Sequence, residues 1–330
     1  MLGTALATPS AQPHLHSTAG LWPDCDTGSG EGRCLPAIEA GFRYGEANHP
    51  GPYGQVALTC SNPGGFRGKE DLALSLGPGI HCFSETQLSA VTQPQFGRAV
   101  QWRARDFQRQ VRAHFGHPAP LRPQSSWAGS WTGVATISDF PSHGISIPIP
   151  PDIWESGRVM VTTHRIDAHD VLVATIYGFP RGPTWPQAKA LNNELLSYLT
   201  TNIVVGYSGM AAIVGDFNFD PMELTQHEVW SAHGWINAQT MAQQQWGQEP
   251  SPTCQGATER DQIWLSPALA SLCRGVTVSD TFADHSTVAV LLELTESPST
   301  FLTWARPSPL QWDLIGDQAW CQQPWNLQYN

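Results

Sequence analysis

The chain has 330 residues, of which 14% are charged and 10% aromatic, and its 17 lysines and arginines against 28 acids give a formal net charge of −11. This composition excludes a largely disordered chain and supplies enough apolar residues for a packed interior. The negative charge argues against a basic protein that coats nucleic acid, so a nucleic-acid substrate would need local positive charge.

No CxxC spacing occurs among the cysteines, which stand at positions 25, 34, 60, 82, 254, 273 and 321. Their odd number favours free thiols over a disulfide framework or a zinc site, and it predicts a reducing compartment. The first 20 residues lack the basic start and apolar core of a signal peptide, and no later run is long enough to span a membrane. We therefore expect a soluble intracellular monomer, nuclear or cytoplasmic, without a membrane partner.

Three regions are predicted from local composition. Residues 1–52 are rich in Gly, Pro, Ser and Ala without a sustained period and are predicted to be a flexible or processed leader. Residues 53–296 form the folded domain. In residues 297–330, four tryptophans stand among prolines and glutamines, which suits either a packing strap or the beginning of a linker.

A strand, a helix and a second strand open the domain, in the stretches "QVALTC" (55–60), "KEDLALSL" (69–76) and "GIHCFSET" (79–86). The following segment, Arg98 to Arg122, is predicted to be helical. It holds six arginines and one acid, Asp106. It is either a solvated helix face or a patch that faces phosphates.

Further strands are predicted at "WTGVATIS" (131–138), at a hairpin of "RVMVTTHRI" (158–166) and "VLVATIYGF" (171–179), and at Met210–Val214, "DQIWLS" (261–266) and "HSTVAVLLEL" (285–294). A proline-rich loop reaches Pro151, and a polar loop reaches Gly256. Helices are predicted near Glu223–His233 and at 186–203, where Leu191, Leu195, Leu199 and Ile203 share one face. His164 and His169, beside the hairpin turn, are expected in solvent.

Polar side chains recur at the ends of these strands. The segment "GDFNFDP" (215–221) places Asp216 and Asn218 two residues apart, so in extended backbone both side chains point to one side, where they can grip a water or a metal ion. Each such residue alone also fits a turn, a core aromatic or a solvated acid. A packed sheet gathers its strand ends along an edge, which predicts one site from Asn62, Glu85, Tyr177, Asp216, Asn218, Asp261, Asp284 and His285.

The order of these motifs resembles the endonuclease/exonuclease/phosphatase superfamily, which includes deoxyribonuclease I, abasic-site endonucleases and the endonucleases of non-LTR (LINE-type) retrotransposons. The resemblance covers residues 55 to 294. It rests on "SNPGGFRGKEDL" (61–72), "FSET" (83–86), "TGVATIS" (132–138), "IYGFP" (176–180), "GDFN" (215–218), "RDQIWLS" (260–266) and "ADHSTV" (283–288). Within the superfamily, "HCFSETQL" (81–88) and "IYGFP" resemble the retrotransposon endonucleases most.

The resemblance implies an α/β fold, a four-layer α/β/β/α sandwich with two facing mixed sheets. It also implies hydrolysis of phosphoric esters with Mg²⁺ or Mn²⁺, with DNA as the expected partner and substrate. Glu85 would be the main metal ligand, helped by Asn62 and Asp284. The resemblance also implies that the carboxylate of Asp216 activates the water and that the amide of Asn218 orients it. His285 would stabilise the phosphate, with Asp261 as its acidic partner, and the phenol of Tyr177 would lie near the phosphate.

Contacts to substrate phosphate are expected from Thr253, Arg67 and Arg181. Two positions depart from relatives. Gly64 stands where several repair enzymes carry an acid, which leaves a second metal position in doubt, and Gln262 replaces a tyrosine. Two alternatives stay open: a phosphatase or phosphodiesterase acting on a small or lipid-linked phosphate, and a catalytically silent retrotransposon-derived remnant or binding module.

Overall fold

The computed structural model describes residues 44–45, 55–118, 132–145, 149–180, 185–282 and 284–294. Within this part of the chain, no helix combines the length and the apolar character needed to cross a membrane. Most of the predicted leader and the whole of the predicted tail, 297–330, lie outside the described residues. Within the leader, Tyr44 and Gly45 form strand β1, which pairs with Val276 and Gly275.

Two mixed β-sheets form the centre of the domain. The first sheet has the strand order β1 (Tyr44–Gly45), β12 (Cys273–Ser279), β13 (Thr287–Glu293), β2 (Gln55–Ser61), β3 (Gly79–Ser84), β5 (Val134–Ser138) and β4 (Arg112–Phe115). The second has the order β10 (Ile236–Asn237), β11 (Asp261–Leu265), β9 (Met210–Asp216), β8 (His169–Tyr177), β7 (Val159–Ile166) and β6 (Ser142–Gly144). Only β2 with β3 and β8 with β9 pair in parallel among the described strands.

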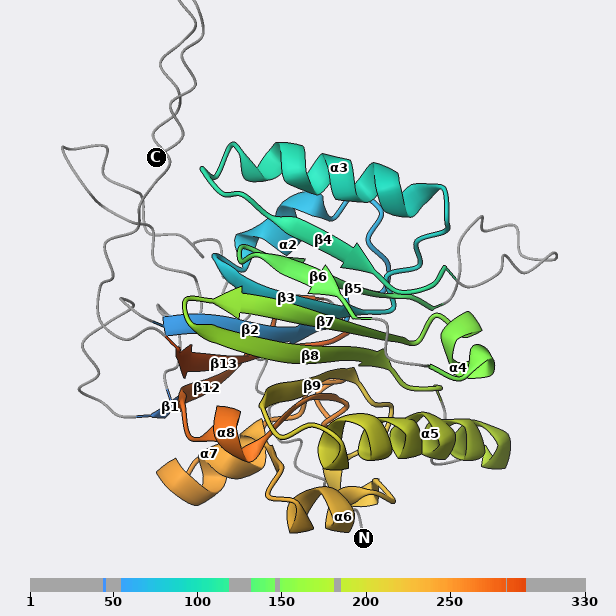
Figure 1. The fold of residues 1–330 in the computed structure, drawn as a ribbon, viewed down its shortest axis with the longest axis vertical. Helices are drawn as coiled ribbons and strands as arrows, with labels where there is room; N and C mark the ends of the chain where they lie inside the picture. Colours follow the sequence, from blue (N-terminus) through green and yellow to red (C-terminus); the bar gives the residue numbers. More distant parts are fainter. Residues whose placement is uncertain are drawn as a thin grey trace, which may run out of the picture. The chain divides into compact units, whose positions relative to one another are not determined.

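The helices of the described residues are α2 (Glu70–Ser75), α3 (Thr92–Ala104), α4 (Pro151–Glu155), α5 (Pro186–Leu199), a π-helix (Thr200–Val205), a 3-10 turn (Pro221–Glu223), α6 (His227–Ala232), α7 (Ala238–Trp246) and α8 (Pro267–Ala270). Of these, α2 and α3 cover the outer face of the first sheet, and α5 and α6 cover that of the second (Figure 1). Each parallel strand pair is joined by a crossover that contains a helix, α2 in the first sheet and α5 in the second, as parallel pairing requires.

Three large apolar cores among the described residues hold these layers together. The core between the sheets contains Leu58 and Cys82 from one sheet and Val173 and Val214 from the other. A second core packs α2 and α3 on the first sheet through stacked rings of Phe66 and Phe96. A third packs α5 and α6 on the second sheet around Trp230 and Trp264. The predicted four-layer α/β/β/α sandwich is therefore confirmed.

Three local predictions are wrong. The arginine-rich segment is not one helix, because α3 ends at Ala104 and residues Arg112–Phe115 form the edge strand β4. Residues in the predicted polar loop before Gly256 instead form α7, which Asn237 caps by accepting the backbone N–H groups of Gln239 and Thr240. Strand β12 was not predicted at all.

Two further expectations change in detail. The helix at 186–203 exists, but its last turn is a π-helix, and of the predicted face Leu195, Leu199 and Ile203 are buried while Leu191, near the first turn, is exposed. His164 is not in solvent. It is fully buried, 3.0 Å from Ser138 Oγ and 2.8 Å from Thr162 Oγ1, because the hairpin packs its polar groups between the sheets.

Candidate active site

Strand topology brings the predicted site residues to one edge of the sandwich. Strands β2 and β3 run in parallel and end just before Asn62 and Glu85. Strand β13, antiparallel to β2, begins just after His285. In the second sheet, Asp216 closes β9 opposite Asp261, the first residue of β11. Residues far apart in the sequence therefore meet where the two sheets face each other.

The side chain of Asn62 joins the residues from the two sheets. Its amide nitrogen donates to Glu85 Oε2 at 3.2 Å and to Asp216 Oδ2 at 2.9 Å, and it lies 3.5 Å from His285 Nε2. Its amide oxygen accepts the backbone N–H of Gly64. Glu85 and His285 thus flank one amide group, so they belong to the same small site.

Asp216 is fixed by contacts that cross between the sheets. Its backbone N–H donates to Ser84 Oγ at 3.0 Å, and that hydroxyl donates to the carbonyl of Ile176 at 2.7 Å. Gly215 must be glycine here, because a Cβ would lie 2.0 Å from the same Ile176 carbonyl oxygen. Burial, and then the charge of Asp261, raise the pKa of Asp216, which makes its carboxylate a better proton acceptor near neutral pH.

His285 and Asp261 form a tight pair. Nδ1 of His285 donates to Asp261 Oδ2 at 2.6 Å, which leaves Nε2 facing the other site residues. Burial alone would lower the pKa of His285, but the hydrogen bond and charge of Asp261, aided by Asp216 and Glu85, outweigh it and raise this pKa to about 9. The imidazole is therefore positively charged at neutral pH.

Tyr177 is buried beside Glu85. Burial, and then the charges of Glu85 and Asp216, raise the pKa of its phenol, so the hydroxyl keeps its proton. The guanidinium of Arg158 lies 4.7 Å from the Tyr177 ring centroid and 4.3 Å from that of Phe179. It also donates to the carbonyls of Tyr177 and Gly178. This stacked cation holds Tyr177 in place and brings positive charge to the site.

Two site residues have backbone conformations that non-glycine residues adopt at a cost. Glu85 has a φ of 53° and Asn218 a φ of 56°, both in the left-handed region. Asn218 is held there because its N–H donates to Asp216 Oδ1 and its side chain donates to the Gly178 carbonyl. Such strained residues concentrate at binding and catalytic sites.

The remaining predicted residues have other surroundings. Asp284 is exposed, and its backbone carbonyl accepts from Gln255 N–H. Thr253 is buried, and its hydroxyl accepts the N–H groups of Arg260 and Asp261. Arg67 is exposed on the loop that follows Asn62. Arg181 lies outside the described residues.

Two arginines of the arginine-rich segment, Arg109 and Arg112, lie away from this edge. Arg109 forms a buried ion pair with Asp139, whose carboxylate also accepts the N–H of Gly79, the first residue of β3. Arg112 aligns through β5 with the same end of β3. That end is about a strand length, roughly 20 Å, from Glu85. Arg109 and Arg112 therefore do not form a patch that faces phosphate at the site, and Arg122 lies outside the described residues.

The donor groups at the site fit a hard divalent cation. Ligand atoms of Asp216, Asp261 and His285 lie within 4.8 Å of one another, and the partly exposed carboxylate of Glu85 stands beside them. Asp261 Oδ1 is buried without a hydrogen-bond partner, as an oxygen that faces a cation or a water would be. Carboxylates that leave room for water are what Mg²⁺ requires.

Sequence reasoning missed three residues at this edge: Arg158, Ser84 and Cys254. Ser84 could have been predicted to lie at the site, since it directly precedes Glu85 within the "FSET" motif. Arg158 begins the hairpin, and no local pattern marks it as a neighbour of Tyr177. Cys254 was recognised only as one of several free cysteines, and its thiol is free here, as are those of Cys60, Cys82 and Cys273.

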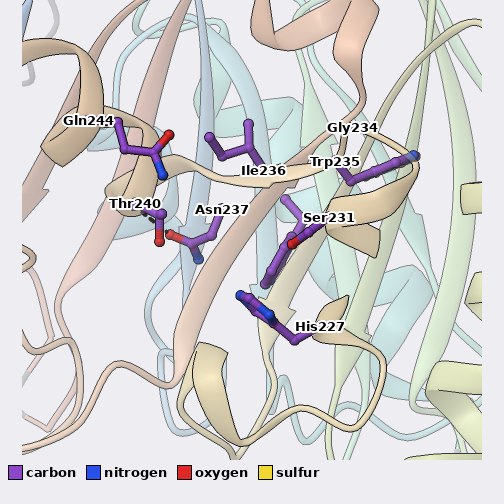
Figure 2. Close-up of a pocket in the computed structure, with 9 residues that line it drawn as sticks. His227, Ser231, Gly234, Trp235, Ile236, Asn237, Thr240 and Gln244 are labelled. Atoms are coloured by element: carbon purple, nitrogen blue, oxygen red, sulfur yellow. Dashed lines mark hydrogen bonds between the residues drawn. The ribbon is translucent and has the colours of Figure 1, made fainter. Parts of the chain in front are cut away.

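A separate hollow of about 290 Å³ lies over the end of the second sheet, between α6 and α7. Figure 2 shows His227 and Ser231 from α6 facing Asn237 and Thr240 across it. The ring of His227 meets Trp264 edge to face at 5.7 Å. Its lining includes none of the predicted site residues, so this hollow is distinct from the candidate active site.

Solved structures with the same fold are known. A 3′-5′ exonuclease from Neisseria meningitidis superposes with a TM-score of 0.52 at 17% identity, over 71% of this chain and 98% of that one. An AP endonuclease from Archaeoglobus fulgidus gives 0.52 at 15% identity, over 72% of this chain and 100% of that one. An endonuclease/exonuclease/phosphatase from Beutenbergia cavernae gives 0.53 at 14% identity, over 72% and 71%.

No protein-family model matches the chain, and no curated protein matches it in sequence. The structural likeness nevertheless shows the fold. The chain has the fold of the endonuclease/exonuclease/phosphatase proteins, as the order of its motifs indicated.

Proposed function

We propose that the protein is a divalent-metal-dependent hydrolase of phosphoric esters and that it cleaves phosphodiester bonds in DNA as an endonuclease. The observation that carries this proposal is the network around Asn62, which joins Glu85, Asp216 and the His285–Asp261 pair at one edge of the fold. The neighbours with this fold include an exonuclease and an AP endonuclease, which supports a nucleic-acid substrate.

Each residue has a task that its surroundings allow. Glu85 would hold Mg²⁺ or Mn²⁺, and the bound ion would add positive charge next to the phosphate. The amide nitrogen of Asn62 donates hydrogen bonds to the carboxylates of Glu85 and Asp216 and so holds both in position. Asp216 accepts the proton of the attacking water, a contribution typically worth about 10² to 10⁴ in rate. Asn218 holds Asp216 in position.

Positive charge on the other side of the phosphate comes from His285. Its Nε2–H can donate to a phosphoryl oxygen while Asp261 keeps the ring charged and oriented. Tyr177 keeps its proton and can donate a second hydrogen bond, held in place by Arg158. The hydroxyl of Thr253 holds the backbone of Arg260 and Asp261 in place, and Arg67 can contact substrate phosphates next to the one that is cleaved. Arg181 stays a proposed contact to phosphate, and Asp284 stays a proposed metal ligand.

Retrotransposon-type endonuclease is the finer proposal, and it rests on the sequence segments at 81–88 and 176–180. The alternative substrate, a small or lipid-linked phosphate, would suit the overall charge of −11. A silent remnant or binding module is disfavoured, because the chemistry-bearing side chains are present and mutually hydrogen-bonded.

The test is nicking of supercoiled plasmid with Mg²⁺, with Mn²⁺ and with EDTA, alongside phosphate release from inositol phosphates. We expect nicking that EDTA abolishes, and a loss of about 10³-fold or more in Glu85→Gln and in Asp216→Asn. Asp170→Asn is the matched control, because this exposed carboxylate pairs with Arg165 at the far end of β8. Phosphate release without nicking would replace the DNA proposal with the alternative substrate.

A further inference from the structure

A cysteine and a histidine face each other at the rim of the candidate active site. Cys254 and His285 are opposite residues of an antiparallel bridge, so their side chains lie on the same side of it. Sγ of Cys254 lies 3.7 Å from Nε2 of His285. Neighbouring backbone bonds, Gln255 N–H to Asp284 O and Ser286 N–H to Thr253 O, hold the two segments together.

Both side chains are prepared for a shared metal ion. Asp261 binds Nδ1 of His285, the arrangement by which carboxylates orient histidine ligands, and this leaves Nε2 directed at the thiol. The surroundings are negative, because Asp216 and Asp261 both act electrostatically on the thiol of Cys254. A negative environment opposes a bare thiolate but attracts a cation that replaces the thiol proton.

We propose that Cys254 Sγ and His285 Nε2 form a binding site for a thiophilic divalent cation such as Zn²⁺, and that its occupancy switches off the proposed hydrolase. Tetrahedral zinc with bonds of about 2.3 Å to sulfur and about 2.0 Å to nitrogen places these two atoms about 3.5 Å apart, close to the observed separation. Cys254 and His285 supply the two protein ligands, and water completes the shell.

The inhibitory part of this inference rests on the proposed function. On binding, the thiol of Cys254 and the imidazolium of His285 each release a proton to solvent, and the metal takes the place of both. His285 then has no N–H to donate to a phosphoryl oxygen. Mg²⁺ does not compete well at this position, because it prefers oxygen ligands to sulfur.

A cobalt titration tests the site without any substrate. Co²⁺ bound to thiolate gives a sulfur-to-metal absorption band, which we expect in the full-length protein with one equivalent of Co²⁺ and not in Cys254→Ser. The background for both carries serine in place of the cysteines at 25, 34 and 321. Cys273→Ala is the matched control, since it removes a buried thiol elsewhere and should keep the band. An unchanged band in Cys254→Ser would overturn the site.

Inhibition is measured separately, as plasmid nicking at fixed Mg²⁺ with increasing Zn²⁺. We expect Cys254→Ser to retain basal nicking and to need about tenfold or more Zn²⁺ for half inhibition, because a hydroxyl is a poor zinc ligand. Equal sensitivity of both proteins would place the inhibitory zinc elsewhere and refute the switch. If the chain cleaves no phosphate ester, the proposed function fails, while the cobalt titration still decides whether the site exists.

Discussion

The substitution Asp261→Asn tests the electrostatic centre of the site directly. In the wild-type protein the pKa of His285 is about 9, against an ordinary value of 6.5. This difference means that the site favours the imidazolium over the neutral ring by about 3 kcal/mol more than water does. Asparagine keeps the shape of Asp261 but removes its charge, which supplies the two largest causes that raise the pKa of His285. The burial that lowers this pKa remains, as do the smaller raising effects of Asp216 and Glu85. We therefore expect this pKa to fall well below 9, to near 6.5.

The consequence at pH 7.5 is about a tenfold drop in the fraction of charged His285, from nearly complete to about a tenth. Nicking should fall at least in that proportion, and the alkaline limb of its pH profile should move to lower pH. Because the folded-state pKa is raised, the pair contributes stability fully below pH 6.5 and loses it as pH rises through about 9. The stability difference between the two proteins should shrink over that window.

The assay is an NMR titration of the histidine rings in EDTA, with the His285 signal assigned by its absence in His285→Gln. Asp280→Asn is the matched control, because this carboxylate accepts from Ser286 Oγ in the same loop. It should leave the titration of His285 unchanged. A wild-type pKa near 6.5, or the same value in Asp261→Asn, would show that the pair does not stabilise the charged ring.

Other expectations follow from residues around the site and in the core. Arg158→Ala should slow nicking by up to about thirtyfold, because a desolvated cation over an aromatic ring is worth about 2 kcal/mol; an unchanged rate would remove Arg158 from the site. Burial lowers the pKa of His81 to about 4 and that of His164 to about 3. The free energy of unfolding should therefore fall as pH drops from 6.5 towards these values. In urea titrations at several pH values, His164→Gln should make this fall less steep. Arg67→Ala should reduce the salt dependence of nicking by about one counterion, whereas Arg105→Ala should not; the reverse result would restore the arginine-rich segment to the substrate path.

Much of the fold was predictable because the central strands are unbroken apolar runs. Strands β2, β9 and β11 are buried along nearly their whole length. Strands β2 and β9 end at polar residues and β11 begins with one, so both the strand and the site position are visible in the sequence. The ordering of these ends along one edge came from the family resemblance. The contacts through Asn62 then follow from strand topology.

The errors have physical causes. Strand β4 is a half-exposed edge strand rich in polar residues, so its pattern continues that of the preceding helix. Strand β12 carries an irregularity between Cys273 and Gly275, which interrupts the alternation that marks a strand. Helix α7 is rich in glutamine, although its two ends, the Asn237 cap and Gly247 at a φ of 70°, were readable signals. The approach of Cys254 to His285 depends on a long-range bridge that has no local pattern.

The hydroxyl of Ser84 spans the gap between the two sheets at the point where their acidic groups meet. Half of the site belongs to each sheet, so the separation of Glu85 from Asp216 is set by the thickness of the interior rather than by any single loop. Enlarging a side chain deep in that interior, such as Val173 or Cys82, would increase the distance between the two sheets and impair turnover without changing any polar group of the site. The packing of the core therefore also sets the distances between the catalytic groups.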